Sequence, residues 1–132
     1  MSKRQPIVVL APDVIIRGFV ASDFREVLIH WRDGAIIPAV TRELLVYYLK
    51  ALRVAGIPDS QLRRWAIWFT AREKTRFMAQ PGDPGMSLRA TLLDAALRCD
   101  ATCIISGGAS IESPGSPLPW MSVAEFLGGE RS

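Results

Sequence analysis

The stretch IVVLAPDVI, residues 7–15, decides the fold class of this chain. An apolar run of this kind is typical of a parallel strand, because helices cover such a strand on both faces. We therefore predict a central strand that brings Ala11 and Asp13 to its carboxyl end. In open α/β sheets, ligands bind in the crevice outside the carboxyl ends of the strands, so a site is expected beside these two residues.

The remainder of the chain alternates helix-like and strand-like patterns. Apolar residues at helical spacing predict four amphipathic helices, which begin near Ser22, Thr41, Pro58 and Ser87. Ser22 or Asp23, Thr41 and Ser87 carry the side-chain oxygens that commonly cap helix N-termini. Each helix is therefore expected to begin at one of these polar or proline-containing positions.

Three short apolar runs between and after these helices predict strands over residues 35–40, 101–106 and 120–123, followed by a short terminal helix over 124–127. Pro38 lies in the first run and implies an edge position, a bend or a short strand, because proline cannot donate a ladder hydrogen bond. The order of elements predicts one domain over residues 1–132. Its expected class is α/β, a three-layer α/β/α sandwich with a central, mostly parallel sheet.

Composition predicts a globular protein, and its charge is consistent either with an anionic partner or with solvated helix faces rich in arginine. The chain has 132 residues, of which 49% are hydrophobic and 22% charged, so it can bury a substantial core. The net charge of +3 is uneven, because residues 42–78 carry eight Arg or Lys against three acids. Such a basic segment favours an anionic partner, although solvated helix faces can have the same composition.

Cysteine usage and hydropathy predict a cytoplasmic protein. Cys99 and Cys103 match neither a disulfide framework nor a zinc-ligand pattern, so we expect two buried or half-buried thiols in a reducing compartment. No signal peptide core is recognisable, and no apolar run approaches the ~18 residues that a membrane span needs. We therefore expect no contact with a membrane.

Aromatic and basic residues are interleaved in the predicted helix after Pro58. Leu62, Trp65, Ala66 and Phe69 have the spacing of an inner stripe, which favours core packing of the rings. A mixture of rings and cations can also bind single-stranded nucleic acid, because bases stack on rings while cations meet phosphates. The candidate nucleic-acid contact surface consists of Arg63, Arg64, Arg72, Lys74 and Arg76.

Four segments carry a family resemblance. They are IVVLAPDVIIRGFV (7–20), TRELLVYYLKAL (41–52), LRATLLDAALRCDATCIISGG (88–108) and WMSVAEFL (120–127). In this order the chain resembles the PIN domain superfamily, particularly the PIN-family toxin components of bacterial toxin-antitoxin modules, over nearly its whole length. The resemblance implies a metal-dependent ribonuclease fold, in which several carboxylates hold Mg²⁺ or Mn²⁺ and the metal activates water.

The acidic positions of that family fall here on Ala11, Tyr47, Arg89 and Gly108, none of which is a carboxylate. The resemblance therefore implies a degenerate active site without a bound metal cofactor. Its implied activity is binding, with RNA, an antitoxin-like protein or a second copy of the chain in a homodimer as the partner. A guanidinium at position 89 is hypothesised to replace the positive charge of the metal, by pairing with Asp13 or occupying the metal's place.

Two alternatives remain open. Asp13, Glu43 and Asp94 lie near the substituted positions and could form a relocated carboxylate set, which predicts an active Mg²⁺- or Mn²⁺-dependent endoribonuclease. Each of the three also has an ordinary role as a turn, helix-start or exposed helix acid. The second alternative is an α/β module that binds a small anionic ligand at Arg89 and the Gly107-Gly108 turn. The sequence lacks both GxGxxG and GxxxxGK[ST] loops, so neither a dinucleotide nor a P-loop site is supported.

Overall fold

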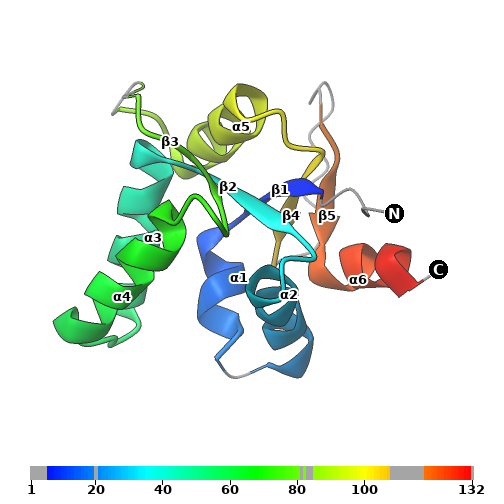
Figure 1. Ribbon diagram of the computed structural model, residues 1–132, viewed down its shortest axis with the longest axis horizontal. Helices are drawn as coiled ribbons and strands as arrows, with labels where there is room; N and C mark the ends of the chain where they lie inside the picture. The colour runs from blue at the N-terminus through cyan, green and yellow to red at the C-terminus, as the bar shows by residue number, and fades with distance from the viewer. Residues whose placement is uncertain (1–5, 20, 81, 83–84, 108–117, 132) are drawn as a thin grey trace.

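The computed structural model describes residues 6–19, 21–80, 82, 85–107 and 118–131. Five parallel strands form one sheet in the order β3-β2-β1-β4-β5, which confirms the predicted three-layer α/β class. Figure 1 shows α5 over one face of the sheet and α1, α2 and α6 on the opposite side, with α3 and α4 beside β2 and β3. The elements are β1 (Ile7–Leu10), α1 (Pro12–Arg17), α2 (Ser22–Arg32), β2 (Ile37–Thr41), α3 (Arg42–Val54), α4 (Asp59–Thr70), β3 (Arg76–Met78), α5 (Leu88–Arg98), β4 (Cys103–Ser106), β5 (Trp120–Ser122) and α6 (Val123–Arg131).

The first strand is shorter than its apolar run suggests. It ends at Leu10, and Pro12 begins the helix α1, because proline cannot donate to a ladder but fits the first turn of a helix. Ala11 still pairs with β4, since its N–H donates to the Ile105 oxygen over 2.9 Å. Asp13 therefore lies in a first helical turn. The strand therefore brings Ala11 to its carboxyl end as predicted, whereas the placement of Asp13 on that strand is wrong.

Pro38 is accommodated inside the sheet rather than at its edge. The Ile37 N–H donates to the Pro6 oxygen, so β2 directs this N–H toward β1 and the Pro38 nitrogen toward β3. Pairing with β3 begins only at Ala39, opposite Arg76. The missing donor of Pro38 therefore falls on the β3 side, where β2 has no ladder partner at this position.

The helix starts agree with the sequence at three of four sites. The Thr41 Oγ1 accepts from the Leu44 N–H, the Ser87 Oγ accepts from the Ala90 N–H, and α4 begins directly after Pro58. The prediction that Ser22 or Asp23 caps α2 is wrong, because its N-cap is Ala21 and the cap makes no side-chain hydrogen bond. Both residues instead lie within the first turn, where a carboxylate suits the helix dipole.

The sequence analysis missed one strand, β3, and predicted the terminal helix too short. β3 has only three residues, too few for a period-two pattern, and it was not predicted. The terminal helix α6 was expected over residues 124–127 and extends from Val123 to Arg131. A reciprocal capping box starts it, because the Ser122 Oγ accepts from the Glu125 N–H and the Glu125 carboxylate accepts from the Ser122 N–H.

The core contains a row of aromatic rings between α2, α3 and α4. Trp31, Tyr48 and Phe69 are each at most 1% exposed, and Phe69 stacks on both of the others. The Tyr48 hydroxyl donates to the Leu10 oxygen, which fixes α3 against the end of β1. Burial raises the pKa of this hydroxyl. Within the described part of the chain, no helix has the length and apolarity to cross a membrane.

Cys99, at the end of α5, and Cys103, the first residue of β4, are buried free thiols, as predicted. Burial raises the pKa of Cys103 from 9.0 to about 11 and also raises that of Cys99. The folded state therefore keeps the Cys103 proton at a pH where the unfolded chain has lost it. Its contribution to stability is complete below pH 9 and declines as the pH rises towards 11.

Between pH 9 and 11, titration of the Cys103 thiol is expected to lower the free energy of unfolding by about 1.4 kcal/mol per pH unit. Urea unfolding at pH 8, 9, 10 and 11 measures the decline. The variant Cys103→Ala should show a shallower decline than the wild type, because its position 103 does not titrate. Equal slopes in the two proteins would contradict the prediction.

Candidate functional site

The strand order places the candidate site between β1 and β4. From β1 the chain continues to β2 and β3 on one side of the sheet, and then returns to β4 and β5 on the other side of β1. The strand order therefore reverses between β1 and β4. Doubly wound sheets open a crevice at such a switch point, at the carboxyl ends of the strands. The chain here consists of Ala11 and α1 after β1, and of Gly107 after β4.

Gly107 holds the two sides of the switch point together. The Gly107 N–H donates to the Asp13 Oδ2, and the Arg17 Nη1 donates to the Gly107 oxygen. Each of the two hydrogen bonds has a donor–acceptor distance of 3.1 Å. A Cβ at position 107 would lie 2.5 Å from the Asp13 Oδ2 and 2.8 Å from the Phe24 ring, so the site admits only glycine without rearrangement. Asp13 therefore acts as an acceptor for the backbone of the β4 turn, the ordinary role that the sequence allowed for it.

The positions where the family resemblance places metal ligands have other contacts. Ala11 is buried at the end of β1, and the Tyr47 hydroxyl donates to the Met86 oxygen over 2.8 Å. The Arg89 guanidinium lies over the Trp120 ring, 5.7 Å from its centroid. Gly108 lies outside the described residues. Arg89 and Asp13 are joined by no ion pair in the described part, where Asp13 instead binds the Gly107 N–H.

Glu43 and Asp94 are brought together by a third residue, Arg98. The Arg98 Nη1 lies 3.3 Å from the Asp94 carboxylate and 3.5 Å from the Glu43 carboxylate, while its Nη2 donates to the Gln80 oxygen over 2.7 Å. The three charged side chains are only 13–28% exposed. We call Glu43, Asp94 and Arg98 the ionic triad. The sequence shows Asp94 and Arg98 at helical i,i+4 spacing, but nothing local connects them to Glu43.

The relocated carboxylates thus fall in two places. Asp13 lies at the β4 turn, and the other two carboxylates belong to the ionic triad. No group of three or more His, Cys, Asp or Glu side chains that could hold a metal ion occurs among the residues that the structure describes.

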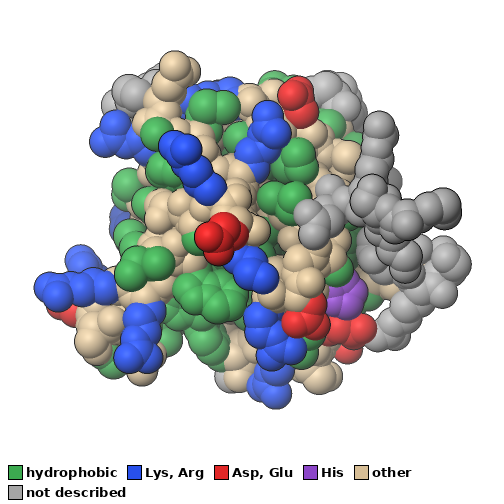
Figure 2. All heavy atoms as spheres, viewed as in Figure 1, with side chains coloured by type: hydrophobic (Ala, Val, Ile, Leu, Met, Phe, Trp, Pro, Cys, Tyr) green, Lys and Arg blue, Asp and Glu red, His purple; other side chains and the backbone are tan. Residues whose placement is uncertain are grey.

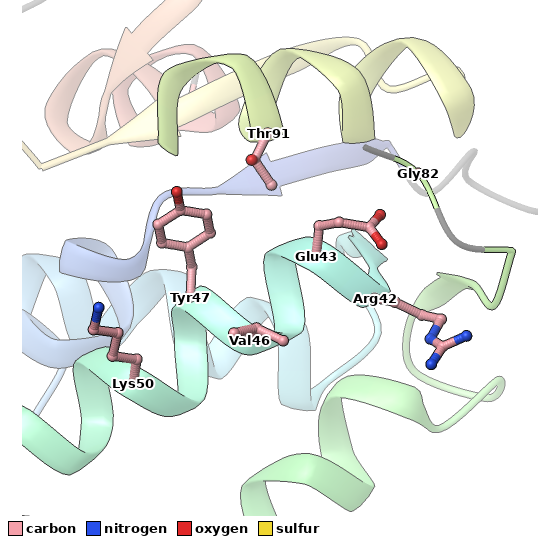
Figure 3. A pocket seen from close by; sticks show the side chains of 7 residues that line it. All are labelled: Arg42, Glu43, Val46, Tyr47, Lys50, Gly82 and Thr91. Carbon is pink, nitrogen blue, oxygen red and sulfur yellow. The ribbon is translucent and has the colours of Figure 1, made fainter. Parts of the chain in front are cut away.

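A groove between α3 and α5 lies beside the triad (Figure 3). Its volume is about 530 Å³. In Figure 3 Tyr47 rises from α3 toward α5, and the Glu43 carboxylate extends toward the segment that contains Gly82. The groove joins elements about 40 residues apart, so no sequence pattern indicated it. Its internal polar groups already have partners, since the Thr91 hydroxyl donates to the Ser87 oxygen and Tyr47 to Met86. The residues that line it are Arg42, Glu43, Val46, Tyr47, Lys50, Gly82 and Thr91.

The basic residues predicted to form one contact surface lie on several elements. Arg63 and Arg64 are exposed on α4, Arg72 follows this helix, and Arg76 is exposed at the start of β3. Lys74 is half-buried, and its Nζ donates to the Arg32 oxygen over 2.7 Å. Arg63 and Arg64 line different hollows, so α4 divides the predicted surface. In the described residues none of the four arginines forms an ion pair, which leaves these charges available to an anionic partner.

The aromatic residues of α4 are only partly internal. Phe69 is buried, as its spacing predicts, whereas Trp65 is half-buried. Trp68, which lies outside the predicted stripe, is 40% exposed. A tryptophan this far from an inner stripe is the sequence signal that could have identified an exposed ring.

Comparison of the chain with protein-family models, with curated proteins and with solved structures gave no match in any of the three cases.

Proposed function

We propose that this chain is a PIN-like domain that has lost metal-dependent hydrolysis and acts by binding single-stranded RNA. The observation that carries the proposal is the ionic triad. Two of the three carboxylates that could have formed a relocated metal site, Glu43 and Asp94, hold the Arg98 guanidinium between them. An arginine in this place supplies the positive charge without the open coordination positions through which a metal activates water.

The contacts of Asp13 support the same proposal. Its carboxylate accepts from the Gly107 N–H, and Arg17 holds the oxygen of the same residue. These bonds stabilise the carboxyl end of the sheet as a structural turn.

RNA is favoured as the ligand by the cations of α4 and the segment after it. Arg63, Arg64, Arg72 and Arg76 are exposed, and the described residues supply them with no carboxylate partner. Cations of this kind bind the phosphate backbone and release its counterions. The exposed ring of Trp68 on the same helix adds a surface on which bases can stack.

One assay on the full chain tests both parts of the proposal. A labelled single-stranded RNA is titrated with protein at several salt concentrations, and the same samples are then examined for cleavage with and without Mn²⁺. We expect binding that weakens with salt, together with intact RNA under both conditions. Cleavage that requires Mn²⁺ and disappears in Asp13→Asn would instead establish the alternative, an active endoribonuclease with relocated carboxylates.

A further inference from the structure

The surface of α4 carries a hollow lined by Arg64, Trp65 and Trp68, with a volume of about 160 Å³. We call it the Trp68 hollow. Figure 2 shows hydrophobic side chains at the surface between α4 and the helices α1 and α2, with Lys or Arg side chains on both sides of them. Phe19, in the connection between α1 and α2, contributes to this apolar area because its ring packs edge-on against Trp65 at 5.6 Å.

The walls of the Trp68 hollow are fixed to the core. The Trp68 ring packs edge-on against Trp31 at 5.4 Å between centroids, and Trp65 contacts both Trp31 and Phe69. Trp31 is 1% exposed, and its Nε1 donates to the Lys74 oxygen over 3.1 Å. The exposed rings therefore have little freedom to lose when a ligand binds, which is the condition for an effective stacking surface.

Charge selects the kind of aromatic ligand. The guanidinium of Arg64 lines the hollow, and Arg25 holds the oxygens of Gly18 and Phe19 at its α1–α2 side. Two indole rings alone would also attract a quaternary ammonium group by cation–π contact. The neighbouring cations disfavour such a ligand and favour a flat, neutral ring joined to an anionic group, as the base and phosphate of a nucleotide are.

From this geometry we infer that the Trp68 hollow holds one base of a single-stranded RNA, stacked on Trp68, with Arg64 on an adjacent phosphate. The inference rests on the proposed function and names the part of the protein surface that contacts a base of the RNA. The hollow has room for about one base, so the rest of the strand follows the exposed cations on either side. The contact is tolerant of sequence, because every base has a face that can stack.

The experiment measures the affinity of the full chain for a labelled single-stranded RNA of about ten nucleotides. Trp68→Ala is expected to weaken binding by about 10-fold to 100-fold, the loss that follows removal of one stacking ring. Ile67→Ala is the matched control, because Ile67 is the preceding residue, 67% exposed, and does not line the hollow. Trp68→Phe should retain most of the affinity, and Arg64→Gln should reduce the salt dependence by about one phosphate contact.

A second measurement on wild-type protein avoids any effect of the substitutions on folding. An RNA of the same length in which every nucleotide is abasic keeps the sugars and phosphates but has no bases to stack. We expect wild-type protein to bind this abasic RNA about as weakly as Trp68→Ala binds the intact RNA. If intact and abasic RNA bind equally well, stacking is refuted while RNA binding stands. If Trp68→Ala instead converts a dimer to a monomer with unchanged RNA affinity, the hollow is an interface between copies. If neither RNA binds, the proposed function and this inference both fail.

Discussion

Arg98→Met, which removes the cation of the ionic triad, is expected to destabilise the protein by about 2–3 kcal/mol. The substitution keeps an apolar stem of similar length but leaves the carboxylates of Glu43 and Asp94 facing each other without a cation. The Gln80 oxygen also loses its donor. The effect is smaller than the ~3–5 kcal/mol typical of a broken buried pair, because the triad is partly exposed.

Chemical denaturation of the wild type and the variant measures this loss, and the chain supplies a matched control. Arg53 and Asp59 form an ion pair of 3.8 Å whose side chains are 73% and 85% exposed. Arg53→Met should therefore cost less than ~1 kcal/mol. Combining Glu43→Gln with Arg98→Met should restore part of the lost stability, because one of the two facing charges is removed. Equal losses in Arg98→Met and Arg53→Met would contradict a structural role for the triad.

Arg98→Met also tests whether the Arg98 guanidinium occupies a place in which a divalent metal ion could bind. Two carboxylates and the Gln80 oxygen are ligands of the type that Mn²⁺ and Ca²⁺ accept. Either ion should raise the melting temperature of Arg98→Met and leave that of the wild type unchanged. A wild type that is stabilised equally would indicate a metal site elsewhere, and the proposal of a lost metal function would fail.

Reversing the charge of Arg64, which lines the Trp68 hollow, together with that of Arg72, which follows α4, should reduce RNA affinity on the order of 100-fold at low salt. The variant is Arg64→Glu with Arg72→Glu, which removes two cations and adds two anions on and after α4. Binding is measured by fluorescence anisotropy at 50 and 200 mM salt. The salt dependence should become shallower, because fewer counterions are released when the RNA binds.

The groove between α3 and α5 provides the control for this experiment. Arg42→Glu with Lys50→Glu changes the net charge by the same amount but on the lining of that groove. A loss confined to the α4 variant would place the RNA on α4. Equal losses in both variants would mean that the RNA senses only the net charge of the protein, and a larger loss in the α3 variant would move the RNA to the groove.

Much of the fold follows from local sequence. The apolar run that forms β1 predicts a covered parallel sheet, and Thr41 and Ser87 cap their helices because an N-cap needs only a side-chain oxygen three residues before an N–H. Local sequence gave a wrong end for β1, because the apolar run of the strand overlaps the first residues of α1. Hydropathy continues through Pro12 to Ile15, but the missing N–H of Pro12 ends the strand and turns Asp13 into a helical residue.

The candidate site depended on contacts that no local pattern contains. Arg98 lies 55 positions from Glu43, and only the packing of α5 against α3 brings their charges within 3.5 Å. The exposure of Trp68 likewise depends on where α2 places Trp31. Hydrophobic period and capping act within a few residues, so the sequence by itself determined the class of the fold and most of its helices. The tertiary structure decided which charges neutralise each other and which ring remains at the surface, because these depend on the distances between segments far apart in the chain.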